Sequence, residues 1–414
     1  MGWTTGRRRI VAAVTATGVA AALALVAYRV LAPAEVNTTA RGDYPALSRP
    51  EPGVVGRLPV APLIVDGRLR VYAAQRQVYA DQPADGRHRS TPYWSYRRWP
   101  ATLDAVVARG TTVVSRWSDG DLVALDARTG QVAWRAEGPE PDRERSVRRT
   151  GTAVVWQPRG LSVVRTVDGR DAVVSSGVGE LRAVGLADGA QLWRAEVGLD
   201  CREPVGVSTG GQLLAVDHCD GPAIVEFRDV ATGVVDRRWR PPGAADDLVA
   251  TLIGCGPAGC AGLRTAGPGD VAARGWLLGS GDPVAAPVLD DPAAELLDGM
   301  AVTLVNGVLT GRALRNGTER WRVSVGPGRL IAVQPGRAHL LTEEHELVTL
   351  DLATGRQLSR FVLNVGSDGT GWTPGPVYAA DGYVAVERLR RPVDPDGDDH
   401  AYYFTAEPLI LAAT

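Results

Sequence analysis

The residues with the clearest potential for chemistry are four cysteines in the middle of the chain. In an oxidising compartment, an even number of cysteines predicts disulfide bonds. Four cysteines allow three connectivities. The expected one joins nearest neighbours, Cys201 to Cys219 across a hairpin and Cys255 to Cys260 across Gly-Pro-Ala-Gly. A structural zinc site is the alternative, but the spacing matches neither a zinc ribbon nor a zinc finger.

Carboxylates gather near the C-terminus, in the segment from Asp394 to Asp399. Oxygen ligands so spaced could hold Ca²⁺, but the segment lacks the downstream glutamate of an EF-hand loop, and we interpret it as a solvated acidic turn. The five histidines show no metal-ligand spacing, and no nucleophile stands in a motif such as G-x-S-x-G. The sequence therefore predicts no catalytic residue, no metal ligand and no enzyme.

Composition limits the classes of partner and of fold. The chain has 45 basic and 47 acidic residues, which leaves no overall field to attract nucleic acid. It contains no lysine, so Schiff-base chemistry on a lysine is excluded. The 49 glycines and 28 prolines among 414 residues favour many short strands joined by turns.

Five segments of the chain repeat one pattern, in which an alternating apolar strand runs into a Thr-Gly, Asp-Gly or Asn-Gly turn. Residues 120–138, 179–198 and 307–326 are the clearest copies, and 223–243 and 345–366 are weaker. The unit is a β-hairpin, whose turn glycine supplies a positive φ. These glycines are Gly130, Gly189, Gly233, Gly317 and Gly355.

Large side chains recur at a fixed distance after the turn glycine. Tryptophan follows four residues later in three copies, at Trp134, Trp193 and Trp321. Arginine follows five residues later in all five, at Arg135, Arg194, Arg238, Arg322 and Arg360. We expect the tryptophans, together with Trp239, to pack as wedges between neighbouring sheets, and the arginines, Arg135, Arg194 and Arg322 above all, to join that packing.

Weaker turns at Gly86, Gly281 and Gly397 extend the series to eight, with successive turns 36 to 59 residues apart. Steps of this size suit a four-stranded sheet with its loops, the unit of a propeller blade. The sequence thus predicts an all-β fold, an eight-bladed β-propeller of four-stranded antiparallel blades over residues 57–414, with seven blades as the alternative.

The repeat resembles the PQQ-like repeat of eight-bladed quinoprotein dehydrogenases and of the propeller of the bacterial outer-membrane assembly lipoprotein. The resemblance is strong in three blades and weaker in the others. It implies the propeller fold but no single function, because enzymes and scaffolds share this repeat.

The resemblance also raises PQQ and Ca²⁺ as cofactors. Quinoprotein dehydrogenases commonly hold PQQ between a tryptophan and a disulfide of adjacent cysteines, beside a calcium ion. No two cysteines are adjacent in this chain, and no motif assigns calcium ligands or a catalytic aspartate. We therefore expect no cofactor, with a PQQ-dependent oxidoreductase as the alternative.

The N-terminus predicts the compartment. Three arginines, residues 7–9, precede an uncharged apolar stretch from Ile10 to Tyr28 that is long enough to span a bilayer as a helix. The positive-inside rule then gives a cytoplasmic tail over 1–9, a transmembrane signal-anchor over 10–32 and a Pro-rich linker over 33–56. The alternative is secretion after cleavage near Ala34, because Ala32-Pro33-Ala34 suits a signal peptidase.

Together these features predict a membrane-anchored, extracytoplasmic scaffold that binds an unknown envelope protein or ligand on a propeller face. The insertion over 137–150 carries charges of both signs and is interpreted as a solvated loop, with a partner-binding loop as the alternative. An envelope protein-assembly factor is a further alternative, although no cysteine for lipidation lies near the end of the apolar segment.

Overall fold

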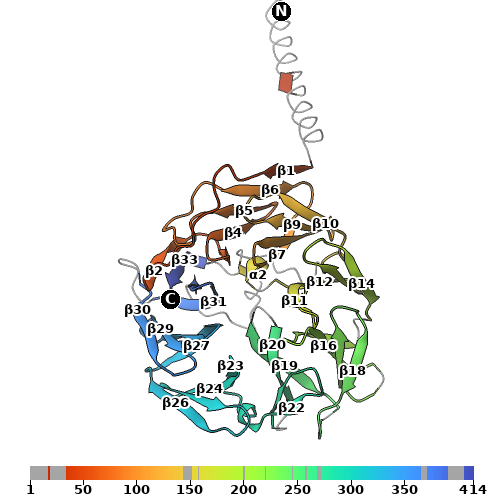
Figure 1. Cartoon of the computed structure of the whole chain (residues 1–414), viewed down its shortest axis with the longest axis vertical. Helices are drawn as coiled ribbons and strands as arrows, with labels where there is room; N and C mark the ends of the chain where they lie inside the picture. The colour runs from red at the N-terminus through yellow and green to blue at the C-terminus, as the bar shows by residue number, and fades with distance from the viewer. Residues whose placement is uncertain are drawn as a thin grey trace, which may run out of the picture.

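The chain forms a ring of β-sheets around a central channel (Figure 1). The computed structural model describes residues 17–18, 34–142, 152–156, 158–198, 201–219, 221–244, 246–256, 259–267, 272–364, 371–389 and 405–414. The sheets number eight, and neighbouring strands within each are antiparallel. This confirms the predicted eight-bladed, all-β propeller.

The first seven blades each consist of four consecutive strands, the first at the channel and the fourth at the rim (Figure 1). Blade 1 contains β3 (Leu63–Val65), β4 (Leu69–Ala74), β5 (Gln77–Asp81) and β6 (Trp94–Arg98), and blade 2 contains β7 (Leu103–Arg109), β8 (Thr112–Trp117), β9 (Leu122–Asp126) and β10 (Val132–Ala136). Blade 3 contains β11 (Leu161–Arg165), β12 (Asp171–Gly177), β13 (Glu180–Gly185) and β14 (Gln191–Glu196), and blade 4 contains β15 (Arg202–Val207), β16 (Gln212–Asp217), β17 (Ile224–Asp229) and β18 (Val235–Trp239). Blade 5 contains β19 (Val249–Gly256), β20 (Gly259–Ala266), β21 (Arg274–Leu277) and β22 (Val284–Ala285), and blade 6 contains β23 (Ala294–Leu297), β24 (Met300–Val305), β25 (Val308–Ala313) and β26 (Glu319–Ser324). Blade 7 contains β27 (Gly328–Gln334), β28 (Arg337–Thr342), β29 (Glu346–Asp351) and β30 (Gln357–Val362).

Blade 8 closes the ring by joining the two ends of the propeller. Its inner strands are β31 (Thr373–Ala380), β32 (Tyr383–Leu389) and β33 (Thr405–Ala413), and its outer strand is β2 (Gly53–Leu58). The register places Leu58 opposite Leu409 and Val54 opposite Ala412. Pairing the first and last segments leaves no open seam between the ends, so the ring is closed by hydrogen bonds as well as by side-chain packing.

A second N-terminal strand, β1 (Glu35–Thr38), adds a fifth strand to blade 1 by pairing with β6. Both β1 and most of β2 lie within residues 33–56, for which we expected only a Pro-rich linker. The expectation failed there because each strand is short and its partner is distant in sequence, so no local hairpin pattern marks it.

The predicted turn glycines connect the third and fourth strands of their blades, and Gly86 and Gly281 occupy the same connection in blades 1 and 5. Gly397 falls between β32 and β33, the second and third strands of blade 8, and lies outside the described residues. The eighth blade therefore has no hairpin of this kind, because β2 supplies its fourth strand.

Two short helices accompany the described strands, α2 (Thr152–Val155) and the 3₁₀ helix η1 (Pro287–Leu289). Within the described parts of the chain, no helix combines the length and the hydrophobicity needed to cross a membrane. The predicted anchor over 10–32 lies outside the described residues apart from Thr17 and Gly18, and so do Asp394 to Asp399 and residues 143–150 of the insertion.

The apolar core lies between the blades. Alternating residues of each strand point to opposite faces of its sheet, so each sheet offers apolar side chains to both neighbours. One buried cluster joins blades 2 and 3, with Leu122 and Trp134 packed against Val173 and Leu186. Because each blade is held mainly by its neighbours, a side chain that fixes one interface fixes the angle between two blades.

Candidate functional site

Tryptophan side chains lock several blades to the next one. The indole Nε1 of Trp193, in blade 3, donates a hydrogen bond of 2.6 Å to the carbonyl of Val230 in blade 4. Trp134 donates to Leu186 at 2.8 Å, and Trp321 to Leu352 at 2.8 Å. In each case the acceptor precedes the turn glycine of the next blade by three residues.

The turn glycine beneath each indole leaves room for the ring. A Cβ built on Gly233 would lie 2.6 Å from the ring of Trp193, and one on Gly189 would lie 2.7 Å from that of Trp134. Gly130 and Gly355 are crowded in the same way by Trp94 and Trp321. The glycine is thus required twice, for its positive φ and for its missing side chain.

The interfaces between blades 4 and 5 and between blades 5 and 6 lack this tryptophan-on-glycine contact. Trp239, the expected wedge of blade 4, instead meets Trp276 of blade 5 edge to face, with ring centroids 4.9 Å apart. Gly317 has a positive φ, but nothing lies within 4 Å of a Cβ built on it. Blade 5, which precedes it, ends in the two-residue strand β22 and carries no tryptophan there.

The arginines at the repeated register divide between contacts within a blade and contacts to a neighbouring blade. Arg194 pairs with Glu180 of its own blade at 2.9 Å, and Arg322 pairs with Glu319 of its own strand at 2.7 Å. Arg135 does reach another blade, where it pairs with Glu35 of β1 at 2.6 Å. All three side chains are more than half exposed, so each pair contributes little to stability.

Two arginines elsewhere, the buried Arg116 and the half-buried Arg264, bridge neighbouring parts of the ring. Arg116 of β8 pairs with Asp104 and donates to the blade 3 carbonyls of Arg159, Gly160 and Ser176 at 2.6 to 2.7 Å. Arg264 of β20 donates in a similar way to carbonyls of the connection from blade 5 to blade 6, including those of Leu289 and Asp291. Each planar guanidinium group donates to several carbonyls at once, which joins the segments that carry them.

Both expected disulfides are present. Cys201–Cys219 closes the open end of the β15–β16 hairpin, with Cα atoms 5.0 Å apart. Cys255–Cys260 joins directly opposed residues of the β19–β20 hairpin near its tip. Asp217 lies near the first pair, and although burial alone would raise its pKa, the Cys219 amide and Arg202 hold that pKa below its usual value. With both sulfurs oxidised, this cluster is not a metal site.

Residues 152–156, which we call the channel segment, cover one side of the channel. α2 lies near the centre of the ring (Figure 1), and Val155 is buried among residues of blades 1 and 2. Trp156 stacks on Tyr378 of blade 8 with ring centroids 5.8 Å apart, and its Nε1 donates to the carbonyl of Pro62 at 2.7 Å. The channel segment is therefore packed against blades 1, 2 and 8.

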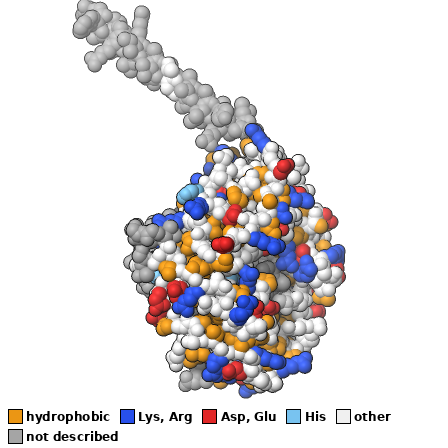
Figure 2. All heavy atoms as spheres, turned by 60° about the vertical axis from the view of Figure 1, so that its left-hand side comes forward, with side chains coloured by type: hydrophobic (Ala, Val, Ile, Leu, Met, Phe, Trp, Pro, Cys, Tyr) orange, Lys and Arg blue, Asp and Glu red, His pale blue; other side chains and the backbone are white. Residues whose placement is uncertain are grey.

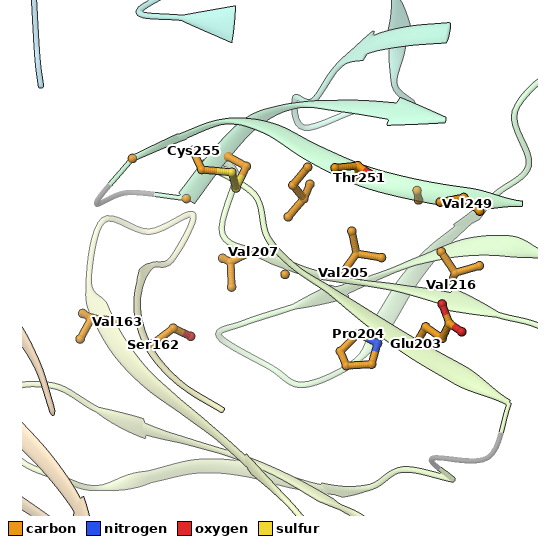
Figure 3. Close-up of a pocket in the computed structure, with 16 residues that line it drawn as sticks. Ser162, Val163, Glu203, Pro204, Val205, Val207, Val216, Val249, Thr251 and Cys255 are labelled. Carbon is orange, nitrogen blue, oxygen red and sulfur yellow. A yellow bond between two sulfur atoms is a disulfide. The ribbon is translucent and has the colours of Figure 1, made fainter. Parts of the chain in front are cut away.

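The other side of the channel contains a pocket of about 560 Å³, which we call the channel pocket. Its wall is formed by the inner strands of blades 3, 4 and 5, namely β11, β15 and β19. Figure 3 shows Val205 and Val207 between the strand that carries Val249 and Thr251 and the strand that carries Ser162 and Val163. The lining residues are Ser162, Val163, Glu203, Pro204, Val205, Gly206, Val207, Val216, Val249, Ala250, Thr251, Leu252, Cys255, Gly256, Gly259 and Cys260.

The channel pocket is an apolar surface with a single charged side chain, the carboxylate of Glu203. One wall, β19, is an eight-residue strand that has a hydrogen-bonded neighbour, β20, on one side only. The other, β15, contains Pro204, which has no N–H, and its register shifts between Pro204 and Gly206. The arrangement leaves β19 with a free edge over residues 249–253, ahead of Gly254, whose positive φ of 66° departs from strand geometry.

A family model places this propeller among known proteins. The model described as outer membrane protein assembly factor BamB matches residues 26–245, more than half of the chain. The chain belongs to the BamB family. No curated protein matches it.

Three solved structures are similar to this BamB-family chain over most of its length. BamB from Moraxella catarrhalis is 14% identical, with 89% of this chain and 100% of that chain covered and a TM-score of 0.43. The WD40 domain of Sif2 is 12% identical, with 90% and 98% covered and a TM-score of 0.43. The designed protein Ika8 is 12% identical, with 90% and 99% covered and a TM-score of 0.41. Similarity at this level does not identify a function.

The channel pocket of this BamB-family propeller does not fit PQQ. A quinone that carries several carboxylates needs basic side chains around it and a flat surface on which to stack. The residues that line the pocket include no arginine and no aromatic ring, and their one charge is the carboxylate of Glu203. The tryptophans at blade register are occupied by glycine contacts between blades instead.

Sequence reasoning missed the channel pocket and the channel segment. The pocket comes from three inner strands whose residues read locally as ordinary alternating strands, so only the ring topology brings them together. Trp94 was also missed, although its Nε1 donates to Ala127 at 2.7 Å as the other tryptophans do. It lies eight residues after Gly86 and so falls outside the four-residue register.

Proposed function

We propose that this protein is a membrane-anchored, extracytoplasmic binding scaffold that holds an extended segment of an envelope protein in the channel pocket. The proposal extends the protein-assembly role in the family's description to a specific surface of this chain. The observation that carries it is the asymmetry of the channel. Blades 1, 2 and 8 are covered by the channel segment, whereas blades 3 to 5 present a pocket beside a free strand edge.

The chemistry of the pocket defines the segment that would fit it. The free edge of β19 offers main-chain N–H and C=O groups along residues 249–253, about 16 Å of extended chain. Branched apolar walls at Val205, Val207 and Leu252 favour branched apolar side chains in the ligand. Glu203 favours a lysine or arginine in the ligand, because a cation there gains from the carboxylate.

We infer a binding role and not catalysis for the same reasons. The pocket lacks a nucleophile paired with a base, and its lining offers neither PQQ nor Ca²⁺ a suitable set of ligands. The proposal includes the location outside the cell membrane, which rests on the apolar segment over 10–32 and its arginines, and on the disulfide bonds, which are typical of oxidising compartments.

Site-specific photo-crosslinking in intact membranes tests the proposal. A photoreactive phenylalanine analogue at Val249, which is 57% exposed on the pocket wall, should trap an envelope protein. The matched control carries the same analogue at Val284, which is 64% exposed in β22 at the rim of the same blade. A partner that crosslinks from position 249 and not from 284 supports the proposal. Equal yield from both positions, or a partner trapped from 284 alone, contradicts it.

A further inference from the structure

We propose that the rim of blade 1, formed by Val36, Arg97 and Trp99, lies against the lipid bilayer and orients the propeller on its edge. The inference rests on the anchor included in the proposed function. It goes further, because it assigns a lipid-facing surface and a direction to the channel.

The first argument is the length of chain available between bilayer and propeller. The predicted anchor ends at Ala32, and β1 begins at Glu35, which pairs with Arg98. Three residues span at most about 11 Å when fully extended. A free linker over 33–56 would have reached about 80 Å by the same measure. The β1 pairing therefore holds blade 1 next to the membrane instead of letting the propeller hang away from it.

The second argument is the side chains found at that point. Trp99 is 38% exposed, and its backbone N–H donates to the carbonyl of Ala34, the first described residue of the propeller, at 2.8 Å. Val36 is 47% exposed and lies opposite Arg97, which is also exposed. An exposed tryptophan with neighbouring arginines is the composition that proteins place at membrane interfaces.

The indole of Trp99 is also held in position. The guanidinium of Arg76 lies 3.9 Å from the centre of the ring, within range of a cation–π interaction. Nearby, Glu35 is paired with both Arg98 and Arg135, and Arg98 also pairs with Asp119 and Asp121, so the carboxylates beside the rim are held in ion pairs. Figure 2 shows basic side chains on the surface near the point where the chain enters the propeller.

This contact determines how the channel is presented. β1 lies at the rim of the disc, and Figure 1 looks along the axis of the ring. With that rim on the bilayer, the channel axis runs parallel to the membrane plane, and both mouths of the channel open sideways. Segments of neighbouring membrane proteins could then enter the channel pocket without first passing beneath the propeller.

Fluorescence quenching in vesicles tests the orientation with the full chain. The four native cysteines form disulfides, so one added cysteine can be labelled alone. We compare Thr38→Cys, in β1, with Val284→Cys, in β22 on the opposite rim (Figure 1). Quencher groups on the lipids should quench the label at position 38 at least threefold more strongly than that at 284. Equal quenching of the two labels, in protein that floats with the vesicles, would overturn the inference.

A longer tether between the anchor and β1 shows whether the rim of blade 1 binds lipid or is only held near the bilayer by the short connection. With twenty Gly and Ser residues inserted between Pro33 and Ala34, the label at position 38 should remain quenched, and adding Trp99→Asp with Val36→Asp should abolish that quenching. Loss of quenching on insertion alone would show that the rim has no affinity for lipid. If the unmodified chain does not float with vesicles, the proposed anchor itself is wrong. That outcome is distinct from a failure of the rim contact, and it points to cleavage near Ala34.

Discussion

The indole of Trp193 lies directly over Gly233, the turn glycine of the next blade, and its Nε1 donates to the carbonyl of Val230 at 2.6 Å. The same relationship recurs in Trp94 on Gly130, Trp134 on Gly189 and Trp321 on Gly355. It explains why tryptophan and glycine share one register in the repeat. Each tryptophan is matched to the glycine of the following copy and not to that of its own.

Substituting Gly233 by alanine should destabilise the propeller by about 3 kcal/mol. An alanine at this position would have to adopt the left-handed backbone conformation, which costs about 1 kcal/mol. Its Cβ would also clash with the indole of Trp193. Gly317→Ala is the matched control, because Gly317 has a similar φ with nothing within 4 Å of its Cβ position. Urea denaturation followed by tryptophan fluorescence measures both. Equal destabilisation by the two variants would show that the indole contact contributes nothing.

Arg116→Gln should destabilise far more than Arg194→Gln. Arg116 is 3% exposed, and its loss leaves Asp104 without its partner and removes three hydrogen bonds to carbonyls of blade 3, at a cost of about 3 to 5 kcal/mol. Arg194 is 54% exposed, and its pair with Glu180 contributes at most about 1 kcal/mol. Thermal unfolding of both variants checks the ranking, and a larger loss for Arg194→Gln would be inconsistent with it.

The buried side chain of His339 should make the propeller less stable in mild acid. Burial lowers the pKa of this side chain from 6.5 to about 4, and its ring nitrogens contact Gln334 and Thr349. Below pH 6.5 the unfolded chain binds a proton that the folded chain excludes until about pH 4. The free energy of unfolding should therefore fall by about 3 kcal/mol across this window and then level off. In His339→Gln that component should vanish, and an unchanged pH profile in the variant would exclude this histidine as its source.

The repeating parts of the fold could be predicted because the residues that determine each hairpin lie close together in the sequence. In seven blades the hairpin carries its own turn glycine, and in three of these it also carries the tryptophan at the same register, so the propeller followed from the spacing of the turns, and the nearest-neighbour disulfides followed from the hairpins. Features that depend on distant residues were different. β2 pairs with β33 across almost the whole chain, and β1 pairs with β6 although four other strands lie between them in sequence, so neither strand has a local partner to reveal it.

The channel pocket could not be predicted for a related reason. Val163, Val205 and Leu252 belong to three blades and have no unusual residue types or spacing. For the repeated arginines, by contrast, the sequence pattern suggested more than the structure shows. Arg194 and Arg322 recur at a fixed register, but they form exposed ion pairs within their own blades. Arg116, which does bridge two blades, has no repeated register to mark it. Its role appears only where blade 3 brings its carbonyls within reach.

The most direct test of binding at the channel pocket uses the partner trapped from position 249. Its affinity is measured for the unmodified chain, for Val249→Arg on the pocket wall and for Val284→Arg at the rim of the same blade. Both valines are more than half exposed, so neither change should impair folding. We predict at least tenfold weaker binding for Val249→Arg, because a fixed cation would repel the ligand's own cation beside Glu203, and unchanged binding for Val284→Arg. Unchanged affinity for Val249→Arg, or an equal loss in both variants, would contradict binding in the pocket.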